Sequence, residues 1–593
     1  MRGSSLPAGA NTSCSSPPPT GTWPTCCCRP NDIPPGLQLG GGPRSSVVDA
    51  ARRRVRMTRI ETQKTLADIL ETGLRAHPDR IAVDALQRSL TFAELDALSG
   101  ALAQQFQQRW DVRRGDRVVV LAQKSLEIVA AAIAIWRAGA VYVPIDVQNP
   151  AKRTEYILQS VKPKLVISSQ AALDRFAQVL GDLPTLSYEA ISALPRHAGA
   201  PVDPPVGLEG DDDCMIIHTS GSTGHPKGAV LQHRSTLVYF HNHNEYLGFG
   251  QDSRGMNNGP FHFDVAIQDT FLPLYFGATV LLHGDLFLSR VMASLIEKKE
   301  ITHLIAVSSV LDLISKDEAC MEGLRHSRLQ VLVTGGELCD PKLINRWLTL
   351  KPDLKVLYGY GPTECNSLCT TYVVRQPDPQ RTRPYPIGKP FTGMKAVLLD
   401  EDRQVIHAPQ TTGVLAMAGP QLMKGYWDLP EETQKALIEF EGERFYVTGD
   451  RCHWDEEGNL HFDGRNDTEV KLRGRRINLN EIRDALLAHP QVRYAVVNTV
   501  VQDGVAELFS FVYSDPPATP THAELEAWLK ERVPGYMMPR YICLANGLPR
   551  TSTAKVSERD IVSSVVGVIA KDPSKTHLVL DAQGGFDNPI QVR

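Results

Sequence analysis

Residues 215–228 read Met-Ile-Ile-His-Thr-Ser-Gly-Ser-Thr-Gly-His-Pro-Lys-Gly. An apolar run typical of a buried strand leads here into small and hydroxylated residues that end at a lysine. Glycines let backbone N–H groups turn toward an anion, and the hydroxyl groups add hydrogen-bond donors. The Walker spacing is missing because Pro226 stands where its second glycine is required. A flexible Ser/Gly linker would not follow a strand, so we expect a phosphate-binding loop.

On both sides of this loop, patterns typical of strands and of helices alternate. Residues 118–122 are a β-branched run, residues 125–137 carry apolar residues at helical spacing, and residues 141–145 predict a second strand. Thr91 and Glu94 have the spacing of a capping box, which predicts the start of a further helix. The alternation continues after the loop. It predicts an α/β fold in which helices cover parallel or mixed sheets.

A change of pattern near residue 467 predicts a second, smaller domain of the α+β type. Helical patterns occupy residues 479–488 and 523–532, and strand patterns lie near residues 494–501 and 508–513. The expected units are a large domain, a small domain and a tail, at residues 57–466, 467–570 and 571–593.

Residues 1–56 differ in composition from the rest of the chain. They contain a proline run at 17–19, a glycine run at 40–42 and a basic run at 52–56. They lack the apolar segment of a secretory signal. We expect a disordered extension, or a reading frame that begins too early, with Met57 as the start. An arginine-rich transit peptide is the remaining alternative.

Charge and hydropathy exclude two classes of partner. The net charge of −4 and the pI of about 6.5 provide no field that would attract nucleic acid or an anionic membrane. The longest apolar run, residues 128–136, is about half of a membrane-spanning length. The eleven cysteines include no CxxC pair with zinc spacing. We expect free thiols and a cytoplasmic protein.

Further motifs follow one another in order along the chain. They are Leu-Thr-Phe-Ala-Glu-Leu (90–95), Arg-Ala-Gly-Ala-Val-Tyr-Val-Pro-Ile-Asp (137–146), Tyr-Gly-Pro-Thr-Glu (360–364), Lys-Gly-Tyr (424–426), Tyr-Val-Thr-Gly-Asp (446–450), Gly-Arg-Asn-Asp (464–467), Val-Lys-Leu-Arg-Gly (470–474), Pro-Gly-Tyr-Met-Met-Pro (534–539) and Lys555. With the loop at 215–228, this set resembles the superfamily of acyl- and aryl-CoA ligases, luciferases and the adenylation domains of nonribosomal peptide synthetases.

The resemblance implies a fold and a reaction in two steps. A large N-terminal domain would carry a small C-terminal domain that rotates between the steps, with Asp467 as the hinge. In the first step a carboxylate attacks the α-phosphate of ATP and pyrophosphate leaves. In the second step the acyl-adenylate passes to a thiol. Negative charge must be screened during the first step, and Mg²⁺ is implied for this purpose.

The resemblance also implies the residues that handle ATP. Glu364 would hold Mg²⁺, which prefers carboxylate and phosphate oxygens, Thr363 would meet the α-phosphate, and Lys227 would be a further catalytic group. Tyr360 would offer a flat face to adenine. The implied nucleotide contacts are Thr219, Ser220, Gly221, Ser222, Thr223, Gly224, Gly335, Gly336, Glu337, Gly359, Tyr360, Asp450 and Arg465. Three of the implied roles have an ordinary alternative. Tyr360 could be a core residue, Asp450 could lie in a turn, and Glu364 could be a surface charge.

Lys555 is the implied catalytic lysine of the first step. Its ammonium would bridge the substrate carboxylate and a phosphate oxygen. The family usually has Asn-Gly before this lysine, whereas Thr553 and Ala554 stand here. A solvated surface lysine is the alternative.

The acid is expected to be a small amino acid with a neutral side chain. In amino-acid-activating relatives the residue that matches Asp264 pairs with the substrate ammonium, and a carboxylate in an apolar pocket is costly without such a cation. A helix N-cap is the alternative role for Asp264. The implied pocket residues are Asp264, Val265, Gln268, Ile305, Val333, Gly335, Gly359, Ser367 and Leu368. The first three of them, Asp-Val-Gln, resemble pockets that accept proline.

The expected acceptor is a phosphopantetheine thiol on a separate carrier protein. No phosphopantetheine-attachment signature follows Lys555. A ligase that uses CoA is the alternative enzyme, and a nucleotide-sensing pseudoenzyme is the alternative outside the enzymes.

Deleting residues 1–56 is expected to leave pyrophosphate exchange unchanged, because the segment has neither a motif nor a core-forming composition. The measurement compares soluble yield and exchange rate of the full and shortened chains. A large drop in either would contradict the prediction.

Overall fold

The computed structural model describes residues 65–195, 207–220, 225–284, 288–465, 468–502, 505–515, 519–545, 548 and 558–580. The chain divides into residues 1–56 and residues 57–593, and every described residue belongs to the second unit. The sequence predictions that lie outside the described residues concern residues 1–56, Gly221, Ser222, Thr223, Gly224, Asp467 and Lys555.

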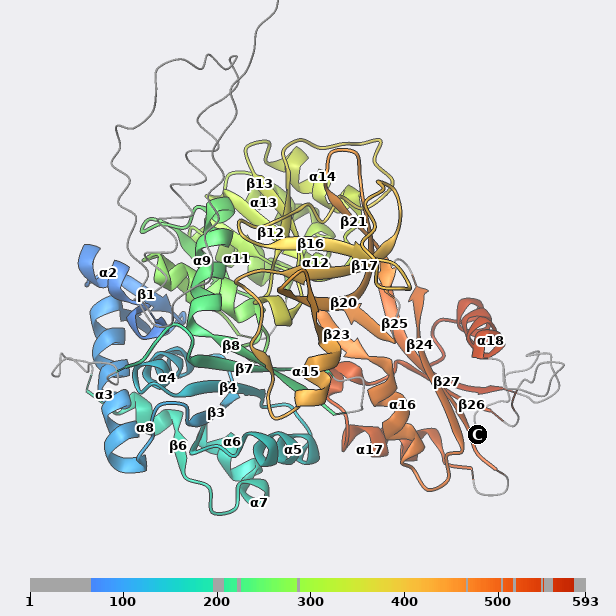
Figure 1. Ribbon diagram of the computed structural model, residues 1–593, viewed down its shortest axis with the longest axis horizontal. Coiled ribbons are helices and arrows are strands. Elements are labelled where there is room, and N and C mark those ends of the chain that lie inside the picture. Colours follow the sequence, from blue (N-terminus) through green and yellow to red (C-terminus); the bar gives the residue numbers. More distant parts are fainter. Residues whose placement is uncertain are drawn as a thin grey trace, which may run out of the picture. The chain divides into compact units, whose positions relative to one another are not determined.

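Described strands form a seven-stranded sheet in the order β18-β8-β7-β4-β3-β5-β6 (Figure 1). The strands from β7 to β6 pair in parallel, and β8 and β18 join antiparallel. Their bounds are β3 (Arg117–Ala122), β4 (Val141–Asp146), β5 (Leu165–Ser168), β6 (Thr185–Ser187), β7 (Asp213–Thr219), β8 (Lys227–Gln232) and β18 (Gly425–Tyr426).

Helices cover both faces of this sheet. Val118 and Val120 of β3 pack with α4 in one core cluster, whereas Val119 and Leu121 pack with α5 in another. Side chains of successive strand residues point to opposite faces, so a parallel strand covered on both sides is apolar throughout. The helices that connect or follow these strands are α4 (Leu126–Arg137), α5 (Ala151–Val161), α6 (Gln170–Arg175), α7 (Ala177–Leu180), α8 (Tyr188–Ser192) and α9 (His233–Leu247).

A second, nine-stranded sheet of described residues has the order β15-β14-β13-β12-β11-β9-β10-β1-β2. Helical crossovers join its parallel strands, as parallel pairing requires. Its strands are β1 (Ile81–Asp84), β2 (Ser89–Thr91), β9 (Arg254–Asn257), β10 (Thr279–Leu282), β11 (His303–Ile305), β12 (Val331–Gly335), β13 (Lys355–Tyr360), β14 (Thr370–Val374) and β15 (Lys389–Pro390). Its helices are η1 (Leu66–Asp68), α2 (Glu71–Ala76), α3 (Phe92–Trp110), η2 (Ile267–Phe271), α10 (Leu272–Tyr275), α11 (Ser289–Lys298), α12 (Ser308–Ser315), α13 (Glu318–Leu324), α14 (Pro341–Leu350) and η3 (Thr363–Cys365).

An antiparallel sheet completes the described part up to residue 465. Strand β20 lies between β17 and β19 and also pairs with β21. The elements are β16 (Lys395–Leu399), β17 (Gly413–Ala418), α15 (Pro430–Ala436), β19 (Leu437–Phe440), β20 (Glu443–Trp454) and β21 (Leu460–Arg465).

The remaining elements have their own core clusters. A two-stranded hairpin, β22 (Glu469–Leu472) with β23 (Arg475–Asn478), precedes a four-stranded sheet in the order β24-β25-β26-β27. The elements after the hairpin are α16 (Leu479–Leu487), β24 (Tyr494–Gln502), β25 (Val505–Tyr513), α17 (His522–Lys530), η4 (Gly535–Met537), β26 (Tyr541–Ala545), α18 (Glu558–Lys571) and β27 (His577–Leu580). The expected domain end at residue 570 is wrong, because β27 pairs with β26.

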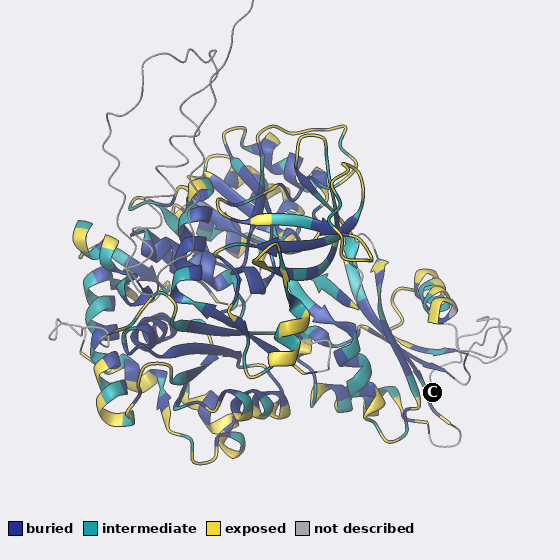
Figure 2. Cartoon of the chain, viewed as in Figure 1, coloured by how far each residue is buried: buried dark blue, intermediate teal, exposed yellow. Residues whose placement is uncertain are grey.

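The largest core cluster contains the whole apolar face of α4 and strands of both large sheets. Every residue of α4 from Leu126 to Trp136 is buried (Figure 2). The Trp136 indole N–H donates to the Cys214 carbonyl at 2.9 Å, and its ring meets Phe271 edge-on at 4.9 Å. No described helix is long and apolar enough to cross a membrane.

The predicted α/β fold, with a larger first part and a smaller second part, is confirmed. The capping box of Thr91 and Glu94 begins α3.

Because three histidines are buried, we predict that acid destabilises the fold. Burial lowers the pKa of His233 to about 4, that of His243 to about 3 and that of His303 to about 4. An unfolded histidine has a pKa of about 6.5, so below that pH the unfolded chain binds more protons. Stability is then lost as pH falls, by at most ~1.4 kcal/mol per pH unit for each histidine.

The urea midpoint at about pH 5.5 is therefore expected to lie below that at about pH 7. His303→Gln is expected to reduce the difference, and the exposed His407→Gln is the control. Equal midpoints at the two pH values would contradict the prediction.

Candidate functional site

Predicted site residues gather where neighbouring strands end. Gly335 at the end of β12 lies opposite Gly359 in β13, and Ile305 of β11 lies opposite Val333. A Cβ at Gly335 would lie 2.2 Å from the Gly359 carbonyl oxygen, so only glycine allows these two backbones to approach. The carboxyl ends of parallel strands therefore bring distant motifs together, as is usual for ligand sites in α/β sheets.

A cavity of about 1090 Å³ opens beside these strand ends. Five predicted nucleotide contacts line it: Gly336, Glu337, Gly359, Tyr360 and Arg465. Such a volume is sufficient for a ligand of nucleotide size. The five predicted nucleotide contacts therefore lie around one cavity.

Asp450 lies behind Tyr360 at this cavity. Its carboxylate accepts a hydrogen bond from the Tyr360 hydroxyl and pairs with Arg465. Arg465 lies directly across the antiparallel pair β20–β21 from Asp450. Burial and the Asp450 charge raise the pKa of Tyr360, which keeps its hydroxyl a donor. The turn alternative for Asp450 is wrong, because the residue lies within β20.

Glu364 is fully buried on η3, so its surface-charge alternative is wrong. Its carboxylate accepts from the Tyr426 hydroxyl at 2.7 Å, and Arg476 Nη1 lies 2.9 and 3.0 Å from its two oxygens. Burial alone would raise the pKa of Glu364, but the charge of Arg476 and the Tyr426 hydrogen bond hold it below its usual value. The carboxylate therefore stays ionised.

The donor chemistry at Glu364 suits Mg²⁺, because a carboxylate is a hard oxygen ligand. No group of three His, Cys, Asp or Glu that could hold a metal occurs among the described residues. The other ligands of such an ion would therefore have to come from phosphate oxygens and water. In the described arrangement the Arg476 guanidinium neutralises Glu364.

Ser220 and Lys227, both in the segment 215–228, have polar partners elsewhere in the chain. The Ser220 hydroxyl donates to the Arg476 carbonyl at 3.0 Å. The Lys227 ammonium pairs with Glu432 and lies 5.5 Å from the centre of the Tyr426 ring. Thr219 ends β7 directly before Ser220.

The hairpin β22–β23, which carries the motif at 470–474, contributes further contacts to the site. The Lys471 ammonium lies 4.7 Å from the centre of the Tyr360 ring, and the Gly474 N–H donates to Glu337 at 3.1 Å. Burial lowers the pKa of Lys471, and Asp450 opposes that shift. In the sequence, the motif at 470–474 was the only sign of these contacts. Its spacing does not show that Lys471 meets Tyr360 or that Gly474 meets Glu337.

Asp264 meets Thr363 at the substrate pocket. The Thr363 hydroxyl donates to Asp264 Oδ2 at 2.6 Å. Burial raises the pKa of Asp264, and the Thr363 hydrogen bond opposes part of that rise. The Asp264 side chain is half-buried, and the helical segment that continues into η2 begins at the next residue, Val265. The position of Asp264 is therefore also that of a helix N-cap, the alternative role.

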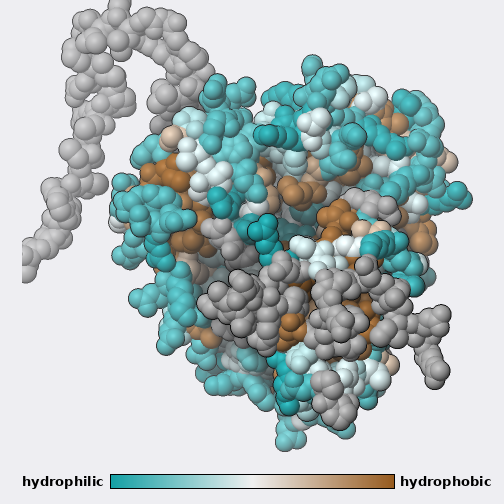
Figure 3. Space-filling model, turned by 90° about the vertical axis from the view of Figure 1, so that its right-hand side faces the viewer, coloured by the Kyte–Doolittle hydropathy of each residue, from teal (hydrophilic) through white to brown (hydrophobic). Residues whose placement is uncertain are grey.

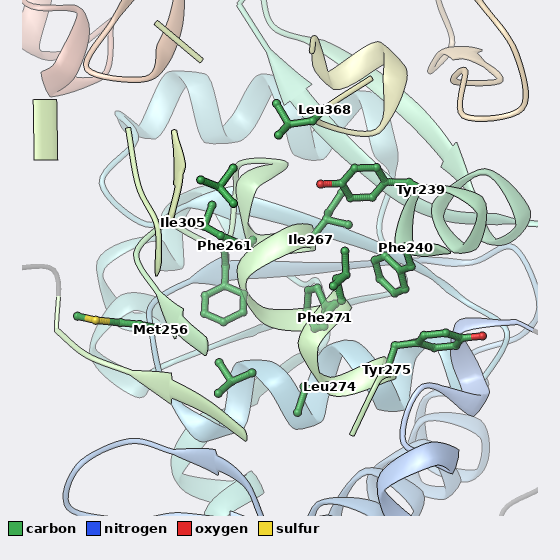
Figure 4. Close-up of a cluster of buried hydrophobic side chains, with 14 of the residues drawn as sticks. Tyr239, Phe240, Met256, Phe261, Ile267, Phe271, Leu274, Tyr275, Ile305 and Leu368 are labelled. Carbon is green, nitrogen blue, oxygen red and sulfur yellow. The ribbon is translucent and has the colours of Figure 1, made fainter. Parts of the chain in front are cut away.

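The other predicted pocket residues form a mostly apolar wall. Ile305 and Leu368 belong to the core cluster shown in Figure 4, where the Tyr239 hydroxyl points toward their side of the cluster. Gln268, on the π-helix η2, accepts from that hydroxyl at 3.2 Å. Tyr239 is therefore a pocket neighbour that sequence reasoning missed.

Glycine and an unusual backbone shape the same wall. A Cβ at Gly359 would lie 2.6 Å from Leu368 Cδ1, so Leu368 can approach only a glycine. Ser367 has a φ of 77°, in the left-handed region. Val265 lies so close to Gly259 that a Cβ there would be 2.0 Å from Val265 Cγ1. Backbone strain of this kind is common at binding sites.

Hydrophobic side chains lie where the large cavity meets solvent. Leu313, Leu338, Val501 and Val505 line the cavity and are exposed. Elsewhere, on the face shown in Figure 3, hydrophobic residues form small patches between hydrophilic ones. An exposed apolar rim of this kind is typical of a surface that receives another molecule.

Comparison with known proteins gives matches to two family profiles. Residues 70–427 match the family described as AMP-binding enzyme, and residues 481–555 match the AMP-binding enzyme C-terminal domain. The chain is 31% identical to the L-proline--[L-prolyl-carrier protein] ligase of Pseudomonas fluorescens, over 84% of this chain and 97% of that protein. It is also 31% identical to tyrocidine synthase 3 of Brevibacillus parabrevis, over 84% of this chain.

The chain is much shorter than several of these relatives. It spans 7% of the length of tyrocidine synthase 3 and 44% of that of tyrocidine synthase 1. Among solved structures, holo-PA1221, an NRPS protein containing adenylation and PCP domains, matches with a TM-score of 0.72 and 25% identity, over 84% of each chain.

Proposed function

The chain belongs to the AMP-binding enzyme family, and from that premise we propose that it activates a small, neutral amino acid as its aminoacyl-adenylate. It would then transfer the aminoacyl group to the phosphopantetheine thiol of a separate carrier protein. The observation that carries this proposal is the hydrogen bond from Thr363 to Asp264. This hydrogen bond joins Thr363, the expected contact of the α-phosphate, to Asp264, the expected contact of the substrate ammonium.

An α-amino acid fits such a pair because its ammonium and carboxylate groups are attached to the same carbon. Asp264 would accept the ammonium, which compensates the cost of burying the aspartate charge. The carboxylate would then lie beside Thr363, where the α-phosphate is expected. A fatty acid has no cation to offer Asp264, so the pocket favours an amino acid.

The rest of the pocket supports a neutral side chain. Val265, Ile305, Val333 and Leu368 are apolar, and Gln268 adds an amide that already accepts from Tyr239. A charged substrate side chain would be buried here without a partner, which is costly. Proline, the substrate named in the matched Pseudomonas ligase, is one candidate among the neutral amino acids.

ATP would occupy the cavity beside Tyr360. Adenine would lie against the Tyr360 ring, Asp450 would accept hydrogen bonds from the ribose hydroxyls, and Arg465 would donate to a ribose oxygen. The loop from Thr219 to Gly224 would bind the phosphates with backbone N–H and hydroxyl donors. Mg²⁺, when bound at Glu364, would screen the phosphate charge.

In the second step, the small domain would turn about Asp467 and bring the hairpin β22–β23 to the site. The contacts of Lys471 with Tyr360 and of Gly474 with Glu337 support the assignment of the described arrangement to this step. The apolar rim of Leu313, Leu338, Val501 and Val505 suits the aliphatic arm of phosphopantetheine. The matched holo-PA1221 contains adenylation and PCP domains, which supports a carrier protein as acceptor.

ATP–pyrophosphate exchange across a panel of amino acids and aryl acids tests the first step. Exchange with neutral amino acids is the expected result. Transfer is then tested with a carrier protein and with CoA as competing acceptors. Exchange with aryl acids alone, or transfer to CoA alone, would favour a CoA ligase, and no exchange with any acid would favour a nucleotide-binding pseudoenzyme.

Asp264→Ala is expected to raise the KM for the amino acid about 10- to 100-fold, since hydrogen bonds to charged groups contribute about 1.5–3 kcal/mol. The raised pKa of Asp264 adds a pH dependence, because protonation removes the charge that pairs with the ammonium. The KM is therefore expected to rise as pH falls through that raised pKa. Asp264→Asn is expected to remove the dependence. Equal exchange with deaminated analogues would contradict the role.

Lys555→Ala is expected to slow adenylation about a hundredfold or more, yet to leave transfer from a supplied aminoacyl-adenylate near normal. Two unit charges about 4 Å apart at an effective dielectric near 20 interact by roughly 4 kcal/mol, an upper guide to the loss. The exposed Lys575→Ala is the control. Normal adenylation by the variant would make Lys555 a surface residue and shift the role to another cation, such as Lys227.

A further inference from the structure

Glu364 is a buried anion whose positive partner comes from a distant segment. The residue has no exposed surface, and Arg476 Nη1 lies 2.9 and 3.0 Å from its two oxygens. Arg476 belongs to β23, in the hairpin that follows the expected hinge. An ionised carboxylate at such a depth requires a cation beside it. The identity of that cation is therefore coupled to the position of the hairpin.

The same hairpin covers the surfaces expected to bind ATP. The backbone carbonyl of Arg476 accepts from Ser220, the first described residue of the phosphate loop beyond β7. Lys471, directly across the hairpin from Arg476, lies over the Tyr360 ring. Bound triphosphate and the docked hairpin would therefore compete for the space beside Ser220.

A metal and a guanidinium are also mutually exclusive at Glu364. Mg²⁺ binds carboxylate oxygens at about 2.0–2.1 Å, which would place it within a few ångströms of Arg476. Two cations at that separation repel strongly in a buried site. Either one neutralises the carboxylate, but both together leave an excess of positive charge.

We propose that Arg476 and Mg²⁺ alternate as the cation of Glu364, so that the hairpin docks only after magnesium pyrophosphate has left. The inference rests on the proposed ATP-dependent adenylation. When the hairpin docks, the Arg476 guanidinium replaces the positive charge of Mg²⁺ beside Glu364. This exchange sets the order of adenylation and transfer. Excess Mg²⁺ with nucleotide holds the hairpin away from the site.

Glu469 makes the exchange reversible. Its Oε2 accepts from Arg476 Nε and from Arg465 Nη2, the latter at 2.8 Å. Glu469 lies on β22, so it moves with the hairpin that carries Arg476. When Arg476 leaves Glu364 it therefore keeps an anionic partner, and neither state leaves the guanidinium without one.

The first test measures the Mg²⁺ requirement of pyrophosphate exchange at fixed ATP in Arg476→Gln. Removing the competitor increases the fraction of protein able to bind the metal, so the half-saturating Mg²⁺ concentration is expected to fall about fivefold or more. Arg476→Lys, which keeps the charge, is expected to lie between this variant and the parent. Arg483→Gln, another arginine of the small domain, is the control and is expected to match the parent. An unchanged Mg²⁺ requirement in Arg476→Gln would overturn the proposal.

The second test measures hydrogen exchange in peptides that span residues 469–478, with ATP and no amino acid. In the parent, adding Mg²⁺ with ATP is expected to increase exchange of the hairpin amides. In Arg476→Gln, the amides are expected to exchange faster even without nucleotide, whereas peptides of β24 and β25 keep the protection that a folded small domain requires. A hairpin that stays protected with Mg²⁺ and ATP would overturn the proposal.

The two tests separate this inference from the proposed reaction. If no acid supports pyrophosphate exchange, the proposed reaction fails, while the hydrogen-exchange response to Mg²⁺ and ATP still decides the role of Arg476. If exchange with amino acids occurs but the hairpin ignores Mg²⁺, the reaction stands and the alternation at Glu364 is wrong.

Discussion

The buried carboxylate of Glu364 is the constraint on which the arrangement of the site depends. It has no contact with solvent, so its charge must be balanced by neighbouring side chains. Tyr426 from β18 and Arg476 from β23 both donate to it. One charge thus ties together the seven-stranded sheet, the motif after β13 and the hairpin that begins the small domain. A hydrophobic residue at this position would pack, but it would remove the reason for these elements to meet.

Polar contacts inside the site are connected in the same way. Asp450 holds the Tyr360 hydroxyl on one side and Arg465 on the other, and Arg465 reaches Glu469 of the hairpin. Each ionised group therefore has a partner of opposite charge. Buried networks that are fully paired fix geometry, whereas a missing member leaves a charge uncompensated. This explains how a nucleotide-sized cavity can be lined by charged residues and still be part of a stable fold.

Packing explains why these polar groups lie where they do. The helix α4 is buried on all sides between the two large sheets, and Trp136 joins it to Cys214 at the start of β7. This fixes the strand that leads into the phosphate loop. In the nine-stranded sheet, Gly335 and Gly359 let the ends of β12 and β13 approach each other closely, and Gly359 also makes room for Leu368. The site is therefore built on rigid strand ends, while the hairpin β22–β23 adds the residues that differ between the two proposed steps.

The sequence by itself determined the fold class, the βαβ order, the start of α3 and the motifs that meet at the strand ends. These features are local: periodicity, capping residues and glycine runs act over a few residues, so their spacing is readable. Only the tertiary structure decided the partners. Arg476 is 112 positions from Glu364, and Tyr360 is 90 positions from Asp450. The contact of Tyr239 with Gln268, the strand β27 beyond the expected domain end, and the burial of Glu364 were likewise decided by packing. Such contacts depend on how whole elements pack, and one chain's spacing carries no signal for charges that meet across two domains.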